Sequence, residues 1–136
     1  MMLKNRSILV TGGAGFIGSH LVERLLLDNE VTVLDNFSSG RIEFLAPYRD
    51  NPDFHLLTGD LMNPAMLDRA VSGKDFIFHL AANPDVKLGS EDTHVHLEQN
   101  VLATYNLLEA MRKNDVRQMA FTSTSTVYGE AAEVPT

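Results

Sequence analysis

The chain has 136 residues, of which 44% are hydrophobic and 21% charged, a composition typical of a globular domain and not of a disordered segment. Its net charge of −7 argues against a nucleic-acid partner held by general electrostatics. Cysteine is absent, which excludes disulfides and thiolate metal sites, and every apolar run is too short for a signal peptide or a membrane span. We therefore expect one soluble domain over residues 1–136, in the cytoplasm and without membrane contact.

Short apolar runs alternate with amphipathic stretches, the pattern of an α/β fold. A buried strand is expected over 7–10, followed by a helix whose apolar positions Ile17, Leu21 and Leu25 recur every fourth residue. The later strands are predicted over 31–34, 54–57, 76–80 and 117–122, with short helices over 41–48 and 64–72 and a long helix over 93–114. Right-handed crossovers then predict a Rossmann-type doubly wound parallel sheet of five strands in the order 3-2-1-4-5. Residues 130–136 are expected to form a loop.

The turn between the first helix and the second strand contains no glycine. Its sequence is Asp28-Asn29-Glu30. Helices often end on a residue in the left-handed conformation, which Asn adopts more readily than most residues. We therefore expect Asn29 to end the first helix in this conformation.

A glycine-rich segment joins the first strand to the first helix. Gly12, Gly15 and Gly18 fit the spacing G-x-x-G-x-x-G, and Gly13 with the last two also fits G-x-G-x-x-G. Such glycines permit a tight turn, a close approach of the backbone to a pyrophosphate and packing of the helix on the strand. The pyrophosphate then meets the positive end of the helix. A glycine-rich turn without a ligand is the alternative, but the strand before it and the periodic helix after it favour dinucleotide binding.

Asp35 ends the second predicted strand, 17 residues after Gly18, close to the separation of about 20 that is usual for dinucleotide-binding folds. A carboxylate there can accept both hydroxyls of an adenosine ribose. It would repel the additional phosphate of NADP at a cost of roughly 1 to 4 kcal/mol for charges ~4 Å apart. Arg41 lies nearby and would soften this repulsion, so we expect a preference for NAD and not an exclusion of NADP. The alternative is a loop carboxylate that forms an Asx turn with Phe37.

These segments resemble the extended short-chain dehydrogenase/reductase family, and within it the NAD-dependent epimerase/dehydratase group that acts on nucleotide sugars. The resemblance covers residues 7–135, and four further motifs agree in order and spacing: Gly59-Asp60-Leu61, His79-Leu80-Ala81-Ala82, Asn100-Val101 and Ser123-Thr124-Ser125-Thr126-Val127-Tyr128-Gly129. It implies an enzyme of carbohydrate metabolism, an isomerase in which bound NAD removes a hydride from sugar C4 and returns it.

The resemblance also implies a set of cofactor-binding residues. They are Gly12, Gly15, Phe16, Ile17 and Gly18 at the pyrophosphate; Asp35, Asn36, Phe37, Ser38, Ser39 and Gly40 at the adenosine ribose; Asp60 and Leu61 at the adenine; and Leu80, Ala81, Ala82 and Asn100 at the nicotinamide ribose. Two alternatives stay open. Leu80 to Ala82 would also suit a strand end in a small-residue core. Asn100 would also suit the role of an interior amide that caps a neighbouring loop.

By the same resemblance, Thr124 is the candidate catalytic residue, because it matches the hydroxyl of the family's Ser/Thr–Tyr–Lys set that bonds the sugar C4 oxygen. Any hydroxyl between Thr122 and Thr126 is the alternative. Ser125 and Thr126 stand where the 4,6-dehydratases of the family carry an Asp-Glu pair as acid and base. This difference favours epimerisation over dehydration and leaves decarboxylating and reducing relatives open.

The Tyr-x-x-x-Lys motif of the family is missing from these residues. The residues four positions after Tyr48, Tyr105 and Tyr128 are Pro52, Glu109 and Ala132. We therefore expect the NAD-binding N-terminal part of an enzyme whose substrate-binding part lies outside these residues, inactive alone. A non-catalytic dinucleotide-binding regulatory module is the alternative, although a module has no need of Thr124 and the segment that follows it.

The remaining expectations concern the binding partners and the roles of the histidines. The complete enzyme would bind a nucleotide sugar and form a homodimer, as the family does. An apolar edge at the fifth strand would make this chain self-associate or leave it only marginally stable. His94 and His96 face different sides of a helix and imply no metal site. His20 and His79 are expected to be packed or capping residues.

Overall fold

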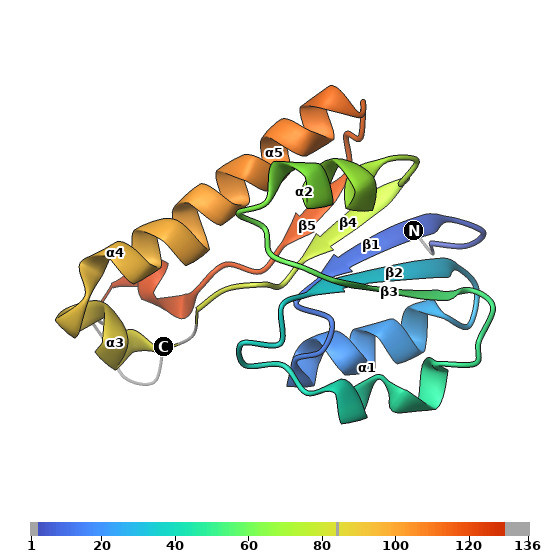
Figure 1. The fold of residues 1–136 in the computed structure, drawn as a ribbon, viewed down its shortest axis with the longest axis horizontal. Helices are drawn as coiled ribbons and strands as arrows, with labels where there is room; N and C mark the ends of the chain where they lie inside the picture. Colours follow the sequence, from blue (N-terminus) through green and yellow to red (C-terminus); the bar gives the residue numbers. More distant parts are fainter. Residues whose placement is uncertain (1–2, 84, 130–136) are drawn as a thin grey trace.

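The computed structural model describes residues 3–83 and 85–129, which form a five-stranded parallel sheet with helices on both faces (Figure 1). The strands are β1 Ser7–Thr11, β2 Glu30–Asp35, β3 Phe54–Thr58, β4 Phe76–His79 and β5 Met119–Phe121. Their order, β3-β2-β1-β4-β5, confirms the predicted Rossmann-type topology. Ser7 pairs with Glu30 of β2, and Ile8 pairs with Phe76 of β4. β2 and β3 lie on one side of β1, and β4 and β5 lie on the other. Such a reversal of strand order opens a crevice at the carboxyl ends of the strands.

The helices are α1 Phe16–Leu25, α2 Pro64–Val71, α3 Val86–Glu91, α4 Thr93–His96 and α5 Ala103–Lys113. The predicted helix over 41–48 is instead two 3-10 turns, Ile42–Phe44 and Ala46–Tyr48, because Pro47 interrupts the helical hydrogen bonds. The predicted long helix does begin at Thr93, but residues Leu97–Leu102 form a π-helical segment between α4 and α5. This segment and α3 were not expected from the sequence.

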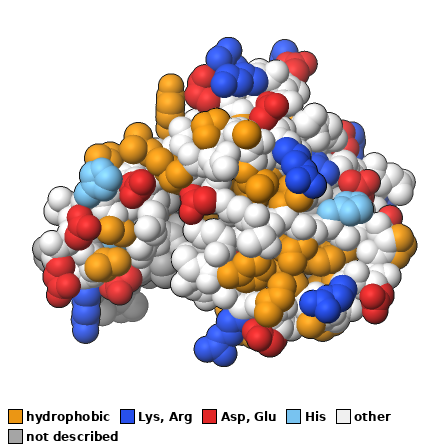
Figure 2. Space-filling model, viewed as in Figure 1, with side chains coloured by type: hydrophobic (Ala, Val, Ile, Leu, Met, Phe, Trp, Pro, Cys, Tyr) orange, Lys and Arg blue, Asp and Glu red, His pale blue; other side chains and the backbone are white. Residues whose placement is uncertain are grey.

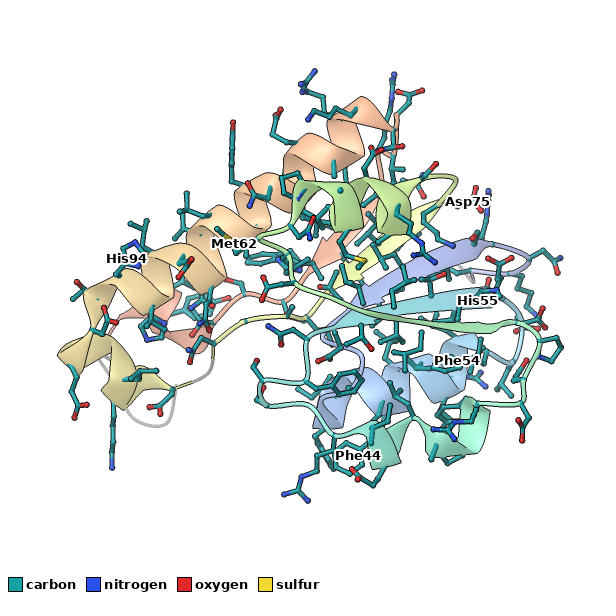
Figure 3. The ribbon with its side chains drawn as sticks, in the orientation of Figure 1. Phe44, Phe54, His55, Met62, Asp75 and His94 are labelled. Atoms are coloured by element: carbon teal, nitrogen blue, oxygen red, sulfur yellow. The ribbon has the colours of Figure 1, made fainter. Side chains whose placement is uncertain are left out.

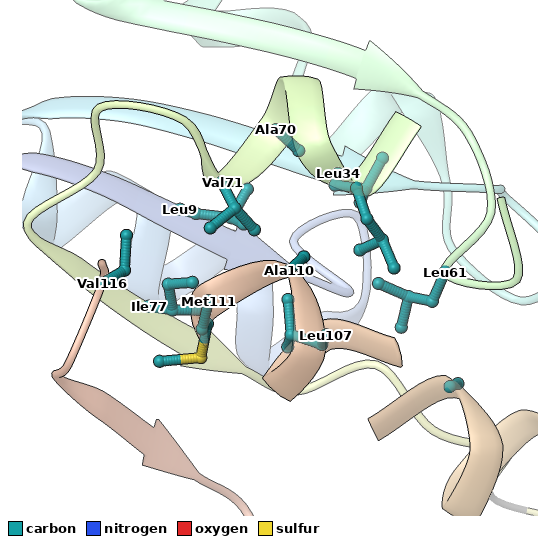
Figure 4. Packing of buried hydrophobic residues seen from close by; sticks show 12 residues of the cluster. Leu9, Leu34, Leu61, Ala70, Val71, Ile77, Leu107, Ala110, Met111 and Val116 are labelled. Carbon is teal, nitrogen blue, oxygen red and sulfur yellow. The ribbon is translucent and has the colours of Figure 1, made fainter. Parts of the chain in front are cut away.

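Each face of the sheet carries its own apolar core, because successive strand side chains point to opposite faces. Leu9 of β1 lies in the core under α2 and α5, whereas Ile8 and Val10 lie in the core under α1 (Figures 1 and 4). Leu67 of α2 and Leu107 of α5 close the first core and are almost fully buried. Burial of both faces explains why the strands read as near-continuous apolar runs in the sequence.

The turn after α1 differs from its prediction. Asn29 is not among the described residues with positive φ, so it does not end the helix in the left-handed conformation. Its buried side chain donates to the carbonyls of Leu25 at 2.9 Å and Leu3 at 3.1 Å, and it accepts from the backbone N–H of Arg6 at 3.1 Å. The amide therefore ties the start of the chain to the end of α1, a role that a glycine cannot fill.

The sheet has β3 and β5 at its two edges. Phe121, the last residue of β5, is 53% exposed, in keeping with the apolar edge that the sequence predicts. Self-association through this edge stays a prediction. None of the described helices has the length and the apolar character that a bilayer crossing requires.

Replacing Asn29 with Gly is expected to lower the free energy of unfolding by about 1–3 kcal/mol, because two carbonyls and one N–H lose their buried partner. Chemical denaturation measures this change. Asn5→Gly is the matched control, since Asn5 does have a positive φ of 52° and glycine is comfortable there. An Asn29→Gly chain as stable as the unmodified one would contradict the stabilising role of the Asn29 side chain.

Candidate functional site

A cavity of about 500 Å³ lies where the strands end, since Gly12, Gly59, Leu80 and Thr122 follow β1, β3, β4 and β5 and also line it. The predicted residues that line it are Gly12, Gly15, Phe16, Ile17, Gly18, Asp35, Asn36, Ser38, Ser39, Gly40, Asp60, Leu61, Leu80, Ala81 and Ala82. Three predicted residues, Phe37, Asn100 and Thr124, are not in its lining. The residues that the prediction missed are Leu34, Gly59, Met62, Gln99, Ala103 and Thr122.

A smaller cavity of about 210 Å³ lies elsewhere, between the 3-10 turns and β3. Apolar side chains such as Ile42 and Phe54 line it together with Arg49. Figure 2 shows hydrophobic side chains gathered over this part of the surface. None of the predicted site residues lines it, so the larger cavity is the candidate site.

In the glycine turn, backbone atoms crowd both Gly12 and Gly18. Gly12 has a φ of +71°, and a Cβ there would lie 2.7 Å from the backbone N of Ala81. A Cβ on Gly18 would overlap the carbonyl oxygen of Gly12. Gly13, in contrast, faces Val33 in the core and does not line the cavity. The spacing that faces the cavity is therefore the one that begins at Gly12.

The first turn of α1 also faces the cavity. Gly15, at its N-cap, has an extended backbone and no side chain to cap the helix. The N–H groups of a first helical turn have no partner within the helix, and they carry the positive end of its dipole. Phe16 and Ile17, in this turn, line the cavity although their side chains are 72% and 70% exposed. The arrangement suits an anion held by backbone N–H groups.

Asp35 closes the cavity at the end of β2 and is 8% exposed. Its Oδ2 accepts from the backbone N–H of Ala14 at 2.9 Å, and its Oδ1 accepts from that of Phe37 at 2.8 Å. The Asx turn weighed as an alternative is thus present, and it holds Phe37 at a φ of 57°, which is uncommon outside glycine. Each carboxylate oxygen has a second acceptor position, so the turn leaves Asp35 able to accept from a ligand.

Asn36 and Asp60 come together from the segments after β2 and β3. Asn36 Nδ2 donates to Asp60 Oδ2 at 2.8 Å, and Asp60 Oδ1 accepts from the backbone N–H of Met62 at 2.8 Å. Asn36 Oδ1 accepts from the backbone N–H of Ser38 at 3.0 Å. These bonds fix the orientation of a second carboxylate at the same end of the cavity as Asp35.

His79 ends β4, directly before Leu80 of the cavity wall, and is 1% exposed. Thr104 Oγ1 donates its proton to the carbonyl of Asn100 at 2.6 Å, so it accepts from Nε2–H of His79 at 2.9 Å. Nδ1 of His79 then accepts from the Thr11 hydroxyl at 2.6 Å, and Thr11 in turn accepts from the backbone N–H of Ala81 at 3.3 Å. This assignment of protons makes the ring neutral, and burial lowers the pKa of His79 to about 4.

These bonds confirm that His79 is a packed residue. The other predicted packing residue, His20, lies against the ring of Phe16, and its Nδ1 bonds the Phe16 carbonyl at 2.8 Å. Within the described residues, no group of three or more acidic or histidine side chains is placed to hold a metal ion.

Asn100 points toward the segment after β4 instead of lining the cavity. Its Oδ1 accepts from the backbone N–H of Asn83 at 2.7 Å, and its Nδ2 lies 2.9 Å from Nδ1 of His96. These contacts agree with the alternative of an amide that holds a neighbouring segment, while a contact with the cofactor stays a prediction. Gln99, one residue earlier, lines the cavity. The sequence offers no signal for this exchange, since it depends on the π-helical segment.

Thr124 is exposed and precedes the 3-10 turn Ser125–Tyr128. Its catalytic role stays a prediction. Thr122 lines the cavity and donates from Oγ1 to the His79 carbonyl at 3.0 Å. Its position directly after β5 was the available signal, because residues that follow parallel strands meet at one edge of the sheet.

Acid is expected to destabilise the chain through His79. Its pKa in the folded chain, about 4, is below the usual ~6.5, so between these pH values the unfolded chain binds a proton that the folded chain does not. The free energy of unfolding should fall as the pH drops from about 6.5 to about 4, by up to about 3 kcal/mol. Denaturation of the unmodified chain and of His79→Gln across this range measures the effect, which should shrink in the variant.

His94→Gln, at an exposed histidine, serves as the control for that series, and it should leave in place the loss of stability that His79 causes. A pH dependence that is the same with and without His79 would contradict the neutral buried ring.

The model of one protein family, the NAD dependent epimerase/dehydratase family, matches residues 8–136 of the chain. The bifunctional UDP-glucose 4-epimerase and UDP-xylose 4-epimerase 1 of Pisum sativum is 33% identical over 144 residues, which cover 99% of this chain and 41% of the relative. The UDP-glucuronic acid decarboxylase 1 of Arabidopsis thaliana is 39% identical over 133 residues, 97% of this chain and 29% of the relative. The chain thus spans less than half the length of these curated relatives.

Solved structures agree with the family model. The UDP-N-acetylglucosamine 4-epimerase from Methanobrevibacter ruminantium M1, in complex with UDP-N-acetylmuramic acid, superposes with a TM-score of 0.90 at 37% identity over 98% of this chain and 43% of its own. The UDP-glucose 4-epimerase of Thermus thermophilus, in complex with NAD, gives 0.83 at 39% identity, over 94% of this chain and 41% of its own. By its sequence over residues 8–136 and by its sheet, the chain belongs to the NAD-dependent epimerase/dehydratase family, whose cofactor is the one predicted.

Proposed function

We propose that the chain is the NAD-binding part of a nucleotide-sugar 4-epimerase of the UDP-glucose 4-epimerase type. The observation that carries the proposal is that one cavity gathers the glycine turn, Asp35 and Asp60, three features that lie far apart in the sequence. Relatives named as 4-epimerases, one of them solved with NAD, support it.

The residues of the cavity fit a dinucleotide. Its volume lies within the range of small-molecule sites. Side chains on Gly12 or Gly18 would clash with the backbone of Ala81 or of Gly12, so the turn that a pyrophosphate would approach keeps its shape only with glycine at these two positions. At one end, Asp35 would accept from the ribose hydroxyls and Asp60 from the adenine amine. At the other end, Ala81 exposes backbone that a nicotinamide ribose can approach closely.

Bound NAD would supply the hydride chemistry at sugar C4, by accepting the hydride and returning it. Thr124 would hold the C4 oxygen by a hydrogen bond and orient its proton for transfer. The base that takes this proton in the family, the Tyr of Tyr-x-x-x-Lys, is not among these 136 residues. We therefore propose that the chain binds the cofactor and is inactive alone, and that the nucleotide-sugar substrate, the homodimer and the cytoplasmic location belong to the complete enzyme.

Two other functions stay as alternatives. The Arabidopsis relative is a decarboxylase, so a decarboxylating enzyme is the nearest alternative within the family; dehydration is disfavoured by Ser125 and Thr126 in the places of the Asp-Glu pair. A non-catalytic regulatory module is the alternative outside enzymes. The reading frame beyond Thr136 separates enzyme from module, because only the enzyme needs a Tyr-x-x-x-Lys motif within a few tens of residues.

Calorimetric titration with NAD and NADP tests the cofactor site directly. We expect NAD to bind at least about fivefold more tightly than NADP, because the Asp35 carboxylate repels the additional phosphate. Asp35→Asn removes the charge at nearly constant size and should bring the two affinities together. Circular dichroism would verify that the variant is folded, since Asp35 also holds the backbone of Ala14 and Phe37.

Asp53→Asn is the matched control for the charge, because Asp53 is exposed, precedes β3 and does not line the cavity. It should leave the ratio of the two affinities unchanged. The proposal fails if the folded chain binds neither nucleotide, and the role of Asp35 fails if Asp35→Asn keeps the preference for NAD.

A further inference from the structure

His96 stands at the centre of a group of hydrogen bonds that joins the long helix to the segment after β4. Its Nε2 lies 3.0 Å from the carbonyl oxygen of Asp85, and its Nδ1 lies 2.9 Å from Nδ2 of Asn100. Asn100 in turn holds both backbone groups of Asn83: its Oδ1 accepts from the N–H at 2.7 Å, and its Nδ2 donates to the carbonyl at 3.4 Å. One ring and one amide thus hold this segment at two points.

The proton positions in this group follow from its chemistry. A carbonyl oxygen only accepts, so Nε2 of His96 carries the proton that is donated to Asp85. Nδ1 is then an acceptor, which is what the amide NH₂ of Asn100 requires. The two protons of that NH₂ go to His96 and to the Asn83 carbonyl, so the neutral ring fixes the amide in one orientation.

The group reaches the cavity through Asn83. Its Nδ2 donates to Oε1 of Gln99 at 2.9 Å, and Gln99 lines the cavity, as does Ala82 on the other side of Asn83 in the chain. His96 itself does not line the cavity. It therefore acts on the cavity wall indirectly, through Asn100 and Asn83.

We propose that His96 is a positioning residue for the nicotinamide half of the dinucleotide site. Its ring holds Asn100 and the segment after β4 so that the carboxamide of Gln99 and the backbone of Ala82 keep a fixed place in the wall. This inference rests on the proposed function, which places the adenosine at Asp35 and Asp60 and the nicotinamide at the opposite end.

Two variants of His96 and two ligands separate this role from general stability. His96→Phe keeps a ring and removes both nitrogen atoms, whereas His96→Asn keeps an acceptor close to the position of Nδ1. NAD fills both halves of the site, and ADP fills only the adenosine and pyrophosphate half. Calorimetric titration of the whole chain with each ligand gives the four variant affinities, to be compared with the two affinities of the unmodified chain.

His96→Phe is expected to weaken NAD binding about tenfold, the effect of one or two lost hydrogen bonds, and ADP binding less than about twofold. His96→Asn should recover most of the NAD affinity. His94→Phe is the control: His94 lies on the outer side of α4 (Figure 3), exposed and 3.8 Å from Glu98, and its loss should change neither affinity.

Hydrogen exchange at the backbone N–H of Asn83 gives a readout that does not depend on the cofactor. Exchange should become faster in His96→Phe, because the amide of Asn100 loses its fixed orientation, and should stay slow in His96→Asn. Unchanged exchange, unchanged NAD binding or an equal loss of NAD and ADP binding in His96→Phe would each overturn the inference. Failure of the unmodified chain to bind either ligand would instead refute the proposed function, and the positioning role would fall with it.

Discussion

The site depends on one close approach of two backbones, that of Gly12 after β1 and that of Ala81 after β4. A single Cβ on Gly12 would sit 2.7 Å from the Ala81 nitrogen, so the two strands can end side by side only because that atom is missing. The parallel pairing of β1 with β4 brings these ends together, and the reversal of strand order around β1 leaves space beyond them. The cavity is therefore a consequence of topology that a glycine makes possible.

Hydrogen bonds, and not apolar packing, hold the ends of these two strands together. His79 is buried at the end of β4, and its two nitrogen atoms bond Thr11 of β1 and Thr104 of α5. A buried polar group is stable only when its hydrogen bonds are made, and here each is made by a group from a different element. The ring thus couples the position of α5 to the ends of β1 and β4, so that helix and sheet present their residues to the cavity in one arrangement.

The sequence was enough to predict the features that show as a periodic apolar pattern or as a turn that needs glycine. The five strands, their order and the spacing from Gly12 to Asp35 follow from apolar periodicity and turn chemistry, which are local properties. Three outcomes were not predicted. Asn29 serves through its side chain and not its backbone, because its partners Leu3 and Arg6 are distant in the chain. The two 3-10 turns did have a signal in the sequence that was not used, because Pro47 stands inside the expected helix. The π-helical segment interrupts the long helix, and no residue type signals it.

The π-helical segment affects how the residues that line such a site can be exchanged during evolution. A π turn holds one residue more than the α-helical turn it replaces, and each residue of an α-helix advances its direction by about 100°. Deleting one residue from Leu97–Leu102 would rotate everything before it, His96 included, while α5 kept its place against the core. Insertions and deletions here can thus exchange the helix residues offered to a ligand without disturbing the packing on which folding depends.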